Sequence, residues 1–207
     1  MRRLVAAVLV VAMSAPLTAR AQETEHCDAR THALAAVIDN DARRARVWYW
    51  GWMTAGLALL GGQSALAAVT TGNPQKEFIA GAATSLFIPT VLLVHPPLVL
   101  SDAPLLDARI AETSLDGHLA DPCVVLPRAR ELLLRDAADQ ALSTAWFAHA
   151  FVIGGNIAVG LFLGIAFKDW FGAVKQAVGG SVIGELQIQT LPTSSLSARG
   201  LGWAGSF

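Results

Sequence analysis

The sequence predicts an all-α integral membrane protein, a four-helix transmembrane bundle with a small helical extracytoplasmic cap. Three stretches contain no Asp, Glu, Lys or Arg: residues 47–75, 78–101 and 140–167. Each is long enough to cross a bilayer, because a helix needs about 20 mostly apolar residues to do so. Only 15% of the 207 residues are charged, whereas an average soluble domain carries about 25%. Such a composition indicates a chain that exposes little surface to water.

The first 21 residues have the pattern of a secretory signal peptide. Two arginines precede a short apolar stretch, and Ala19-Arg20-Ala21 supplies small residues at the two positions that a signal peptidase reads. We predict cleavage after Ala21, with an uncleaved N-terminal anchor as the alternative. Both interpretations place residues 22–46 outside the cytoplasm, so that the mature chain begins on the extracytoplasmic side.

We predict a transmembrane bundle over residues 47–191, in which an extracytoplasmic loop, residues 96–142, separates the second span from the third. Pro89 predicts a kink in the second span. The fourth span is the least apolar because it contains Lys175 and Glu185, and the alternative places it in the interface as an amphipathic helix. The predicted spans are residues 47–69, 77–95, 143–167 and 170–191, followed by a flexible tail over residues 192–207.

Aromatic side chains support this layout, since tryptophans occur where the predicted spans meet the headgroups, as at Trp48 and Trp146. The orientation conflicts with the positive-inside rule, because arginines such as Arg43 and Arg128 fall on the predicted outer side. We retain the orientation that the signal peptide sets. We expect the protein to be located in the bacterial inner membrane.

The segments outside the membrane contain both cysteines, Cys27 and Cys123. Two spans separate them, so they lie on the same side, and an oxidising compartment favours a disulfide between them. Residues 28–46 and 127–140 are predicted helices, and the acidic segment 101–122 is predicted to be a solvated loop. We expect no metal and no cofactor, since no metal-ligand spacing occurs.

Small residues recur four positions apart within the predicted spans, a spacing that lets helix backbones approach closely. We favour packing inside one bundle, with a dimer interface as the alternative. The residues concerned are Ala58, Gly62, Ala150, Gly154, Gly160, Gly164, Gly180 and Gly184.

A few polar residues lie inside the predicted spans, and Gln63, His149 and Asn156 form the candidate polar site. Each is expected to hydrogen-bond a neighbouring helix. A hydrolase dyad of Ser64 with a histidine is rejected, because Ser64 lies about 24 Å below the outer edge of its span whereas His149 lies near that edge.

Three functional hypotheses follow. The first is a non-enzymatic structural or partner-binding subunit of the envelope. The second is a channel or transport component whose path is lined by Gln63, His149 and Asn156. The third is an enzyme that acts on lipid at the outer interface with His95, His149 and Asp102. We expect membrane lipids and another membrane or envelope protein as partners, and no nucleic acid because the net charge is −1.

Overall fold

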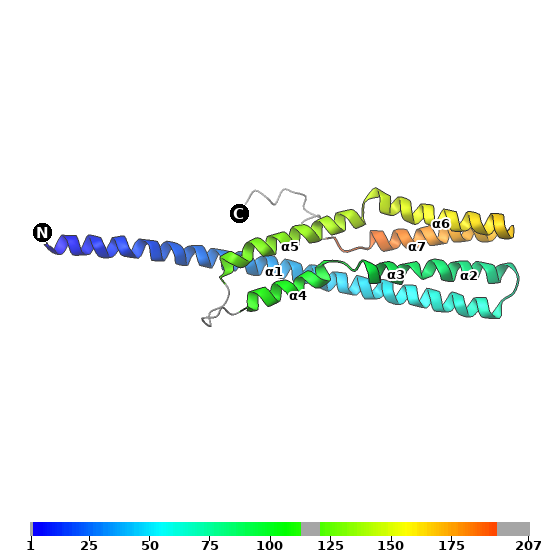
Figure 1. The fold of residues 1–207 in the computed structure, drawn as a ribbon, viewed down its shortest axis with the longest axis horizontal. Helices are drawn as coiled ribbons and strands as arrows, with labels where there is room; N and C mark the ends of the chain where they lie inside the picture. Colours follow the sequence, from blue (N-terminus) through cyan, green and yellow to red (C-terminus); the bar gives the residue numbers. More distant parts are fainter. Residues whose placement is uncertain (1, 113–120, 194–207) are drawn as a thin grey trace. The chain divides into compact units, whose positions relative to one another are not determined.

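In a computed structural model, the chain is helical wherever it forms regular structure within the described residues, 2–112 and 121–193, with side chains described from His26 onward (Figure 1). This confirms the all-α prediction. The signal peptide, predicted over residues 1–21, and most of the tail, predicted over residues 192–207, lie outside the residues whose side chains are described. The helices are α1 (Arg2–Val69), α2 (Asn73–Ser85), α3 (Phe87–Val94), α4 (Val99–Ala111), α5 (Pro122–Ser143), α6 (Trp146–Phe167) and α7 (Trp170–Gln189).

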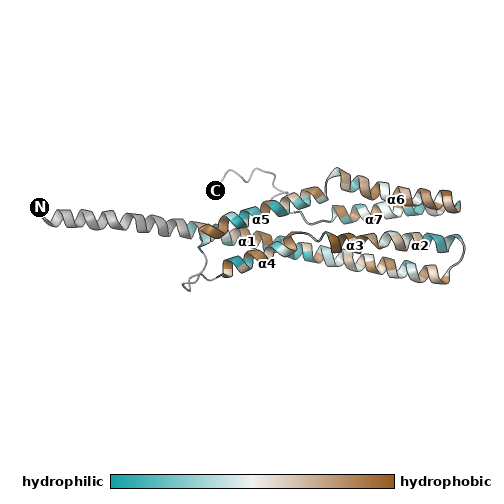
Figure 2. Cartoon of the chain, in the orientation of Figure 1, coloured by the Kyte–Doolittle hydropathy of each residue, from teal (hydrophilic) through white to brown (hydrophobic). Residues whose placement is uncertain are grey.

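Three helical stretches are long and apolar enough to cross a membrane: His26–Val69, Asn73–Ala111 and Pro122–Phe167. In the apolar window of each stretch, only 11%, 22% and 17% of the residues are buried. Figure 2 shows hydrophobic residues along α3 and α6, and many of these, such as Leu93 and Ile165, are exposed. Apolar side chains that are exposed in such numbers are typical of a surface that faces lipid.

The chain divides into two compact units, of which unit 1 comprises Met1–Asn40 and Ser101–Leu134. The Cys27 and Cys123 sulfurs lie at disulfide distance, with their Cα atoms 5.0 Å apart, as the sequence predicts. The Thr31 hydroxyl donates to the carbonyl oxygen of Pro122 at 3.2 Å, close to the disulfide. Fully buried apolar side chains form a core of the kind found in soluble domains, among them Ile38, Leu106, Ala129 and Leu132.

The prediction of a solvated loop over residues 101–122 is wrong for its first half, because Val99–Ala111 forms α4. Ala103 and Leu106 are buried with Val99, and this i, i+4, i+7 spacing is the apolar stripe of an amphipathic helix. The sequence predicts the acidic residues of this segment to be solvated, yet Asp107 is exposed on this helix whereas Asp102 is buried. The second half of this segment, residues 113–120, lies outside the described residues.

Unit 2 comprises Asp41–Leu100 and Arg135–Phe207. Its second predicted span is divided into α2 and α3 at Leu86, three residues before Pro89. A proline has no N–H to donate to the carbonyl four residues earlier, which explains why the helix breaks here, on the N-terminal side of the predicted kink. The helix that corresponds to the third predicted span, α6, begins at Trp146, three residues later than predicted, after an interruption at Thr144–Ala145.

The predicted small-residue positions divide into two sets. Gly160, Gly164, Gly180 and Gly184 lie where α6 and α7 pack together, and an added Cβ at Gly160 would lie 2.6 Å from the Ala173 carbonyl oxygen. The second set, which is exposed, consists of Ala58, Gly62, Ala150 and Gly154. An added Cβ at either of its two glycines would meet nothing within 4 Å. Packing within the chain therefore uses the first set and leaves the second free.

Candidate functional site

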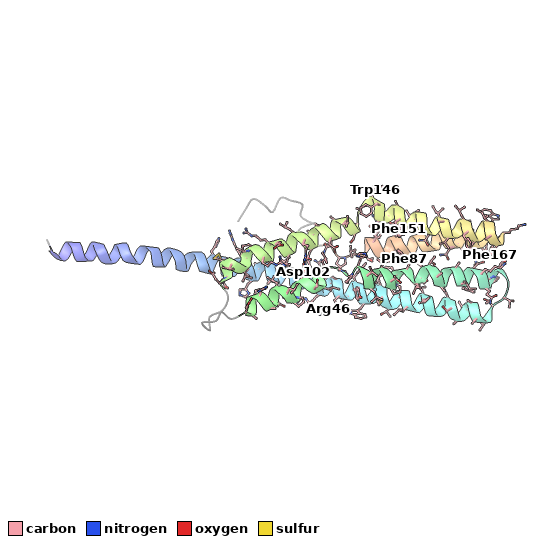
Figure 3. All side chains as sticks on the ribbon, in the orientation of Figure 1. Arg46, Phe87, Asp102, Trp146, Phe151 and Phe167 are labelled. Atoms are coloured by element: carbon pink, nitrogen blue, oxygen red, sulfur yellow. A yellow bond between two sulfur atoms is a disulfide. The ribbon has the colours of Figure 1, made fainter. Side chains whose placement is uncertain are left out.

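Unit 2 contains a cavity of about 500 Å³ between side chains of α1, α2, α3, α6 and α7. Most of its lining is apolar. Phe87 of α3 and Phe151 of α6 belong to this lining, and their ring centroids lie 5.6 Å apart. Figure 3 labels both residues. Other apolar lining residues are Leu59, Phe78, Ile88 and Ile183.

Hydrogen bonds between amides and hydroxyls cross the cavity wall. The Gln176 amide donates to the Thr84 hydroxyl at 3.0 Å, which joins α7 to α2. The Ser85 hydroxyl donates to Gln63 Oε1 at 3.4 Å, which joins α2 to α1. Among the described residues, Gln63 Nε2 and Gln176 Oε1 take part in no further hydrogen bond. Each of these two glutamines therefore retains an amide atom for another molecule, a donor on Gln63 and an acceptor on Gln176.

Asn156 adds a third amide to the same cavity. Its Nδ2 donates to the Val152 carbonyl at 2.8 Å, one turn earlier on α6. Its Oδ1 occupies the place that a side chain at residue 180 would need, so only glycine fits at Gly180 without moving this amide. The close approach of α6 and α7 and the orientation of Asn156 thus depend on the same glycine.

A salt bridge between Glu77 and Lys175 lies at one end of the cavity, where α2 and α7 begin. The Lys175 ammonium also lies 4.9 Å from the centroid of the Phe171 ring. The side chain of Glu77 is the more buried of the pair, at 22% exposure against 50% for Lys175. Each charge is therefore neutralised by a residue of another helix.

A second polar contact joins α6 to α7, with His149 Nδ1 2.7 Å from Glu185 Oε2. The other carboxylate oxygen of Glu185, Oε1, is buried and has no hydrogen-bond partner among the described residues. His149 is not part of the cavity lining. Of the three residues that form the predicted polar site, the structure brings Gln63 and Asn156 to one cavity and places His149 in a separate contact with Glu185.

The residues considered for catalysis are placed apart from this cavity. Asp102 is completely buried within unit 1, where it accepts a hydrogen bond from Ser101. His95 is exposed at the end of α3, and Ser64 is exposed on α1. Within residues 26–112 and 121–193, no group of three His, Cys, Asp or Glu side chains is arranged to hold a metal ion.

Sequence reasoning did not find the Gln176–Thr84 hydrogen bond or the Glu77–Lys175 salt bridge. The partners are 92 and 98 residues apart in the chain. One signal for the salt bridge was available. Glu77 and Lys175 lie near the starts of two predicted spans, and both of these spans start on the cytoplasmic side.

No family model, curated protein or solved structure is similar enough to this chain to count as a match. The function is therefore argued from the residues themselves.

Proposed function

We propose that this chain is a non-enzymatic binding subunit of the bacterial envelope, which crosses the inner membrane four times and holds unit 1 on the outer side. The cavity of unit 2 is the observation that carries the proposal. Its lining combines apolar side chains with a few amides and hydroxyls, the combination that binds and orients a ligand. Lipid tails offer no hydrogen bonds, so a molecule that pairs with these amides has an advantage over lipid in filling the cavity.

The position of the far end of α7 supports a fourth span. The Trp48 indole N–H lies 3.3 Å from both the Gln187 carbonyl oxygen and the Thr190 hydroxyl, and the Trp52 indole donates to the same hydroxyl at 3.0 Å. The Arg44 guanidinium donates to the Thr193 carbonyl at 3.3 Å. The end of α7 therefore lies level with the tryptophans that mark the predicted outer end of the first span. A helix of 20 residues is about 30 Å long, the thickness of the hydrocarbon core.

The charges in α7 are compatible with a span because each is paired. Lys175 is near one end of α7 and pairs with Glu77, while Glu185 is near the other end and pairs with His149. Charged side chains within membrane helices typically face the protein interior and pair with one another. This pairing favours a span over a helix that lies in the interface.

The exposed small-residue positions support a protein partner within the membrane. Gly62 on α1 and Gly154 on α6 have nothing near the position of a Cβ, and each is four residues from an exposed alanine, Ala58 or Ala150. A helix of another protein can approach such positions closely. Membrane lipids cover the same faces when no partner is present.

Single cysteines introduced outside the helices test the fourth span. We expect a membrane-impermeant maleimide to label Thr193→Cys from outside intact spheroplasts. Thr71→Cys, in the turn between α1 and α2, should react only after the membrane is made permeable. The native cysteines are expected not to react, because they form the disulfide. Labelling of Thr193→Cys only from the cytoplasmic side would show that α7 does not cross.

Purification from native membranes in a mild detergent tests the binding role. We expect the full chain to retain a bound lipid or a second membrane or envelope protein, identified by mass spectrometry. Gly62→Leu and Gly154→Leu should each reduce the recovery of a protein partner, whereas Gly51→Leu, also in open space on α1, should not. Recovery of the chain with neither partner nor lipid would contradict the proposal.

A channel or transport component is the second candidate, because Gln176 and Asn156 line the same cavity as the Glu77–Lys175 pair. Ion or solute flux in liposomes that contain only this protein distinguishes the two. Flux that is abolished by Asn156→Leu would favour the channel and count against a purely binding subunit.

A further inference from the structure

We infer that the unit 2 cavity binds one neutral amphiphile, a single apolar chain that carries a carbonyl or hydroxyl group and enters from the bilayer. This inference rests on the proposed function only in that it places unit 2 within the membrane. It names the class of ligand that the cavity takes, and it depends on the shape of the cavity and on the depth of its polar groups.

The extent of the cavity favours a single extended chain as occupant. Its lining on α7 extends from Gly172 to Gln187, a rise of about 22 Å at 1.5 Å per residue. Its volume of about 500 Å³ is within the size range of small-molecule sites. A long, slender apolar chain suits a cavity that combines this length with this volume.

The depth of the polar groups decides that the ligand is neutral. Asn156 is at the middle of α6, and Gln176 and Thr84 join α7 to α2 on the inner side of that level. A charged headgroup at this depth is costly, and the lining charges of Glu77 and Lys175 already neutralise each other. A carbonyl or hydroxyl group can enter the hydrocarbon when it gains a hydrogen bond there.

The hydrogen-bonding groups of the cavity match such a ligand. Gln63 Nε2 is a donor without a partner among the described residues and suits a carbonyl oxygen. Gln176 Oε1 is an acceptor that likewise has no partner among the described residues, and it suits a hydroxyl. Both residues line the cavity, and both are held by a hydrogen bond through their other amide atom. Such anchoring leaves the amides oriented before a ligand binds.

Two adjacent glycines on α6 provide a matched test. An added Cβ at Gly154 or Gly155 would meet nothing within 4 Å, but only Gly155 lines the cavity. Gly155→Phe therefore fills the cavity, whereas Gly154→Phe adds the same ring outside it. Gly179→Leu fills the cavity from α7, where the glycine also has open space, and replaces Gly155→Phe if that variant does not fold.

The experiment uses the full chain in phosphatidylcholine nanodiscs and a long-chain alcohol that carries a diazirine in its chain. We expect photolabelling of α6 and α7 peptides that line the cavity. Gly155→Phe should reduce this labelling to the level of the outer helix faces, and Gly154→Phe should leave it unchanged. Gln176→Leu should weaken it about three- to tenfold, as expected for the loss of one hydrogen bond.

Competitors identify the source of the ligand. A short-chain quinone and a monoacylglycerol both carry the required groups, and displacement of the alcohol by one of them assigns the natural ligand to quinones or to acylglycerols. Equal labelling by a diazirine alkane, or unchanged labelling in both Gly155→Phe and Gly179→Leu, would overturn the inference and leave the proposed function intact. Release of the protein from membranes by alkaline carbonate would instead refute the proposed function itself.

Discussion

Replacing both Cys27 and Cys123 with serine is expected to lower the free energy of unfolding of unit 1 by about 3–5 kcal/mol, because the disulfide closes a long loop. The two cysteines are 96 residues apart, and a free loop of that length corresponds to about 4.7 kcal/mol in the chain-entropy model. The effect falls towards the lower end of the range if the helices of unit 2 that lie inside the loop stay folded when unit 1 unfolds. The remaining core, around Ile38 and Leu132, is too small to compensate fully.

Hydrogen exchange of the full chain in nanodiscs measures this effect directly. Amides of α4 and of the first half of α5 should exchange faster in the double serine variant, while amides of α6 and α7 should keep their wild-type rates. Treatment of the wild-type protein with a reductant should reproduce the change, and the same reductant should have no effect on the variant. Unchanged exchange in unit 1 would contradict a stabilising role for the disulfide.

The second large effect is expected at Gly160, where Leu should destabilise unit 2 by about 2–3 kcal/mol through overpacking. An added Cβ at Gly160 would lie 2.6 Å from the carbonyl oxygen of Ala173, which is backbone and cannot rotate away. To accept the new side chain, α6 and α7 must therefore move apart. That separation also disturbs the contact between Gly180 and Asn156.

Gly154→Leu is the matched control, because it makes the same substitution on the same helix in open space. It is expected to change stability by less than about 0.5 kcal/mol, or to increase it slightly, since leucine has the better helix propensity. Unfolding in mixed micelles of increasing SDS content, followed by tryptophan fluorescence, compares the two variants. Equal midpoints for both would show that α6 and α7 do not pack through Gly160.

Local rules explain the parts of the fold that the sequence predicted. The charge-free stretches predicted where apolar helices would form. An unpaired charge is costly in hydrocarbon, and a backbone there must satisfy its own hydrogen bonds, as a helix does. The Cys27–Cys123 pair followed from the parity of the spans and from the compartment. The same reasoning missed α4, because its acidic residues were counted without its buried stripe of Val99, Ala103 and Leu106.

The candidate site was predicted only in part, because its partners come from distant segments. Gln63 and Asn156 were identified as polar residues in lipid, yet the amide that completes their cavity is Gln176, in a segment whose location the sequence left open. His149 and Asn156 are seven residues apart and were expected to share a site. Instead, His149 contacts Glu185 of α7 outside the cavity lining.

By itself, the sequence determined that this chain is helical, that three of its stretches are apolar enough to cross a membrane, and which two cysteines can pair. These properties depend on composition and on short periodicities, which every segment carries alone. The tertiary structure decided which glycines allow close packing, since Gly154 and Gly160 have the same local signature but only Gly160 meets α7. It also decided which amides share a cavity, because that depends on the rotation of each helix about its axis, and the rotation is set by the neighbours against which the helix packs.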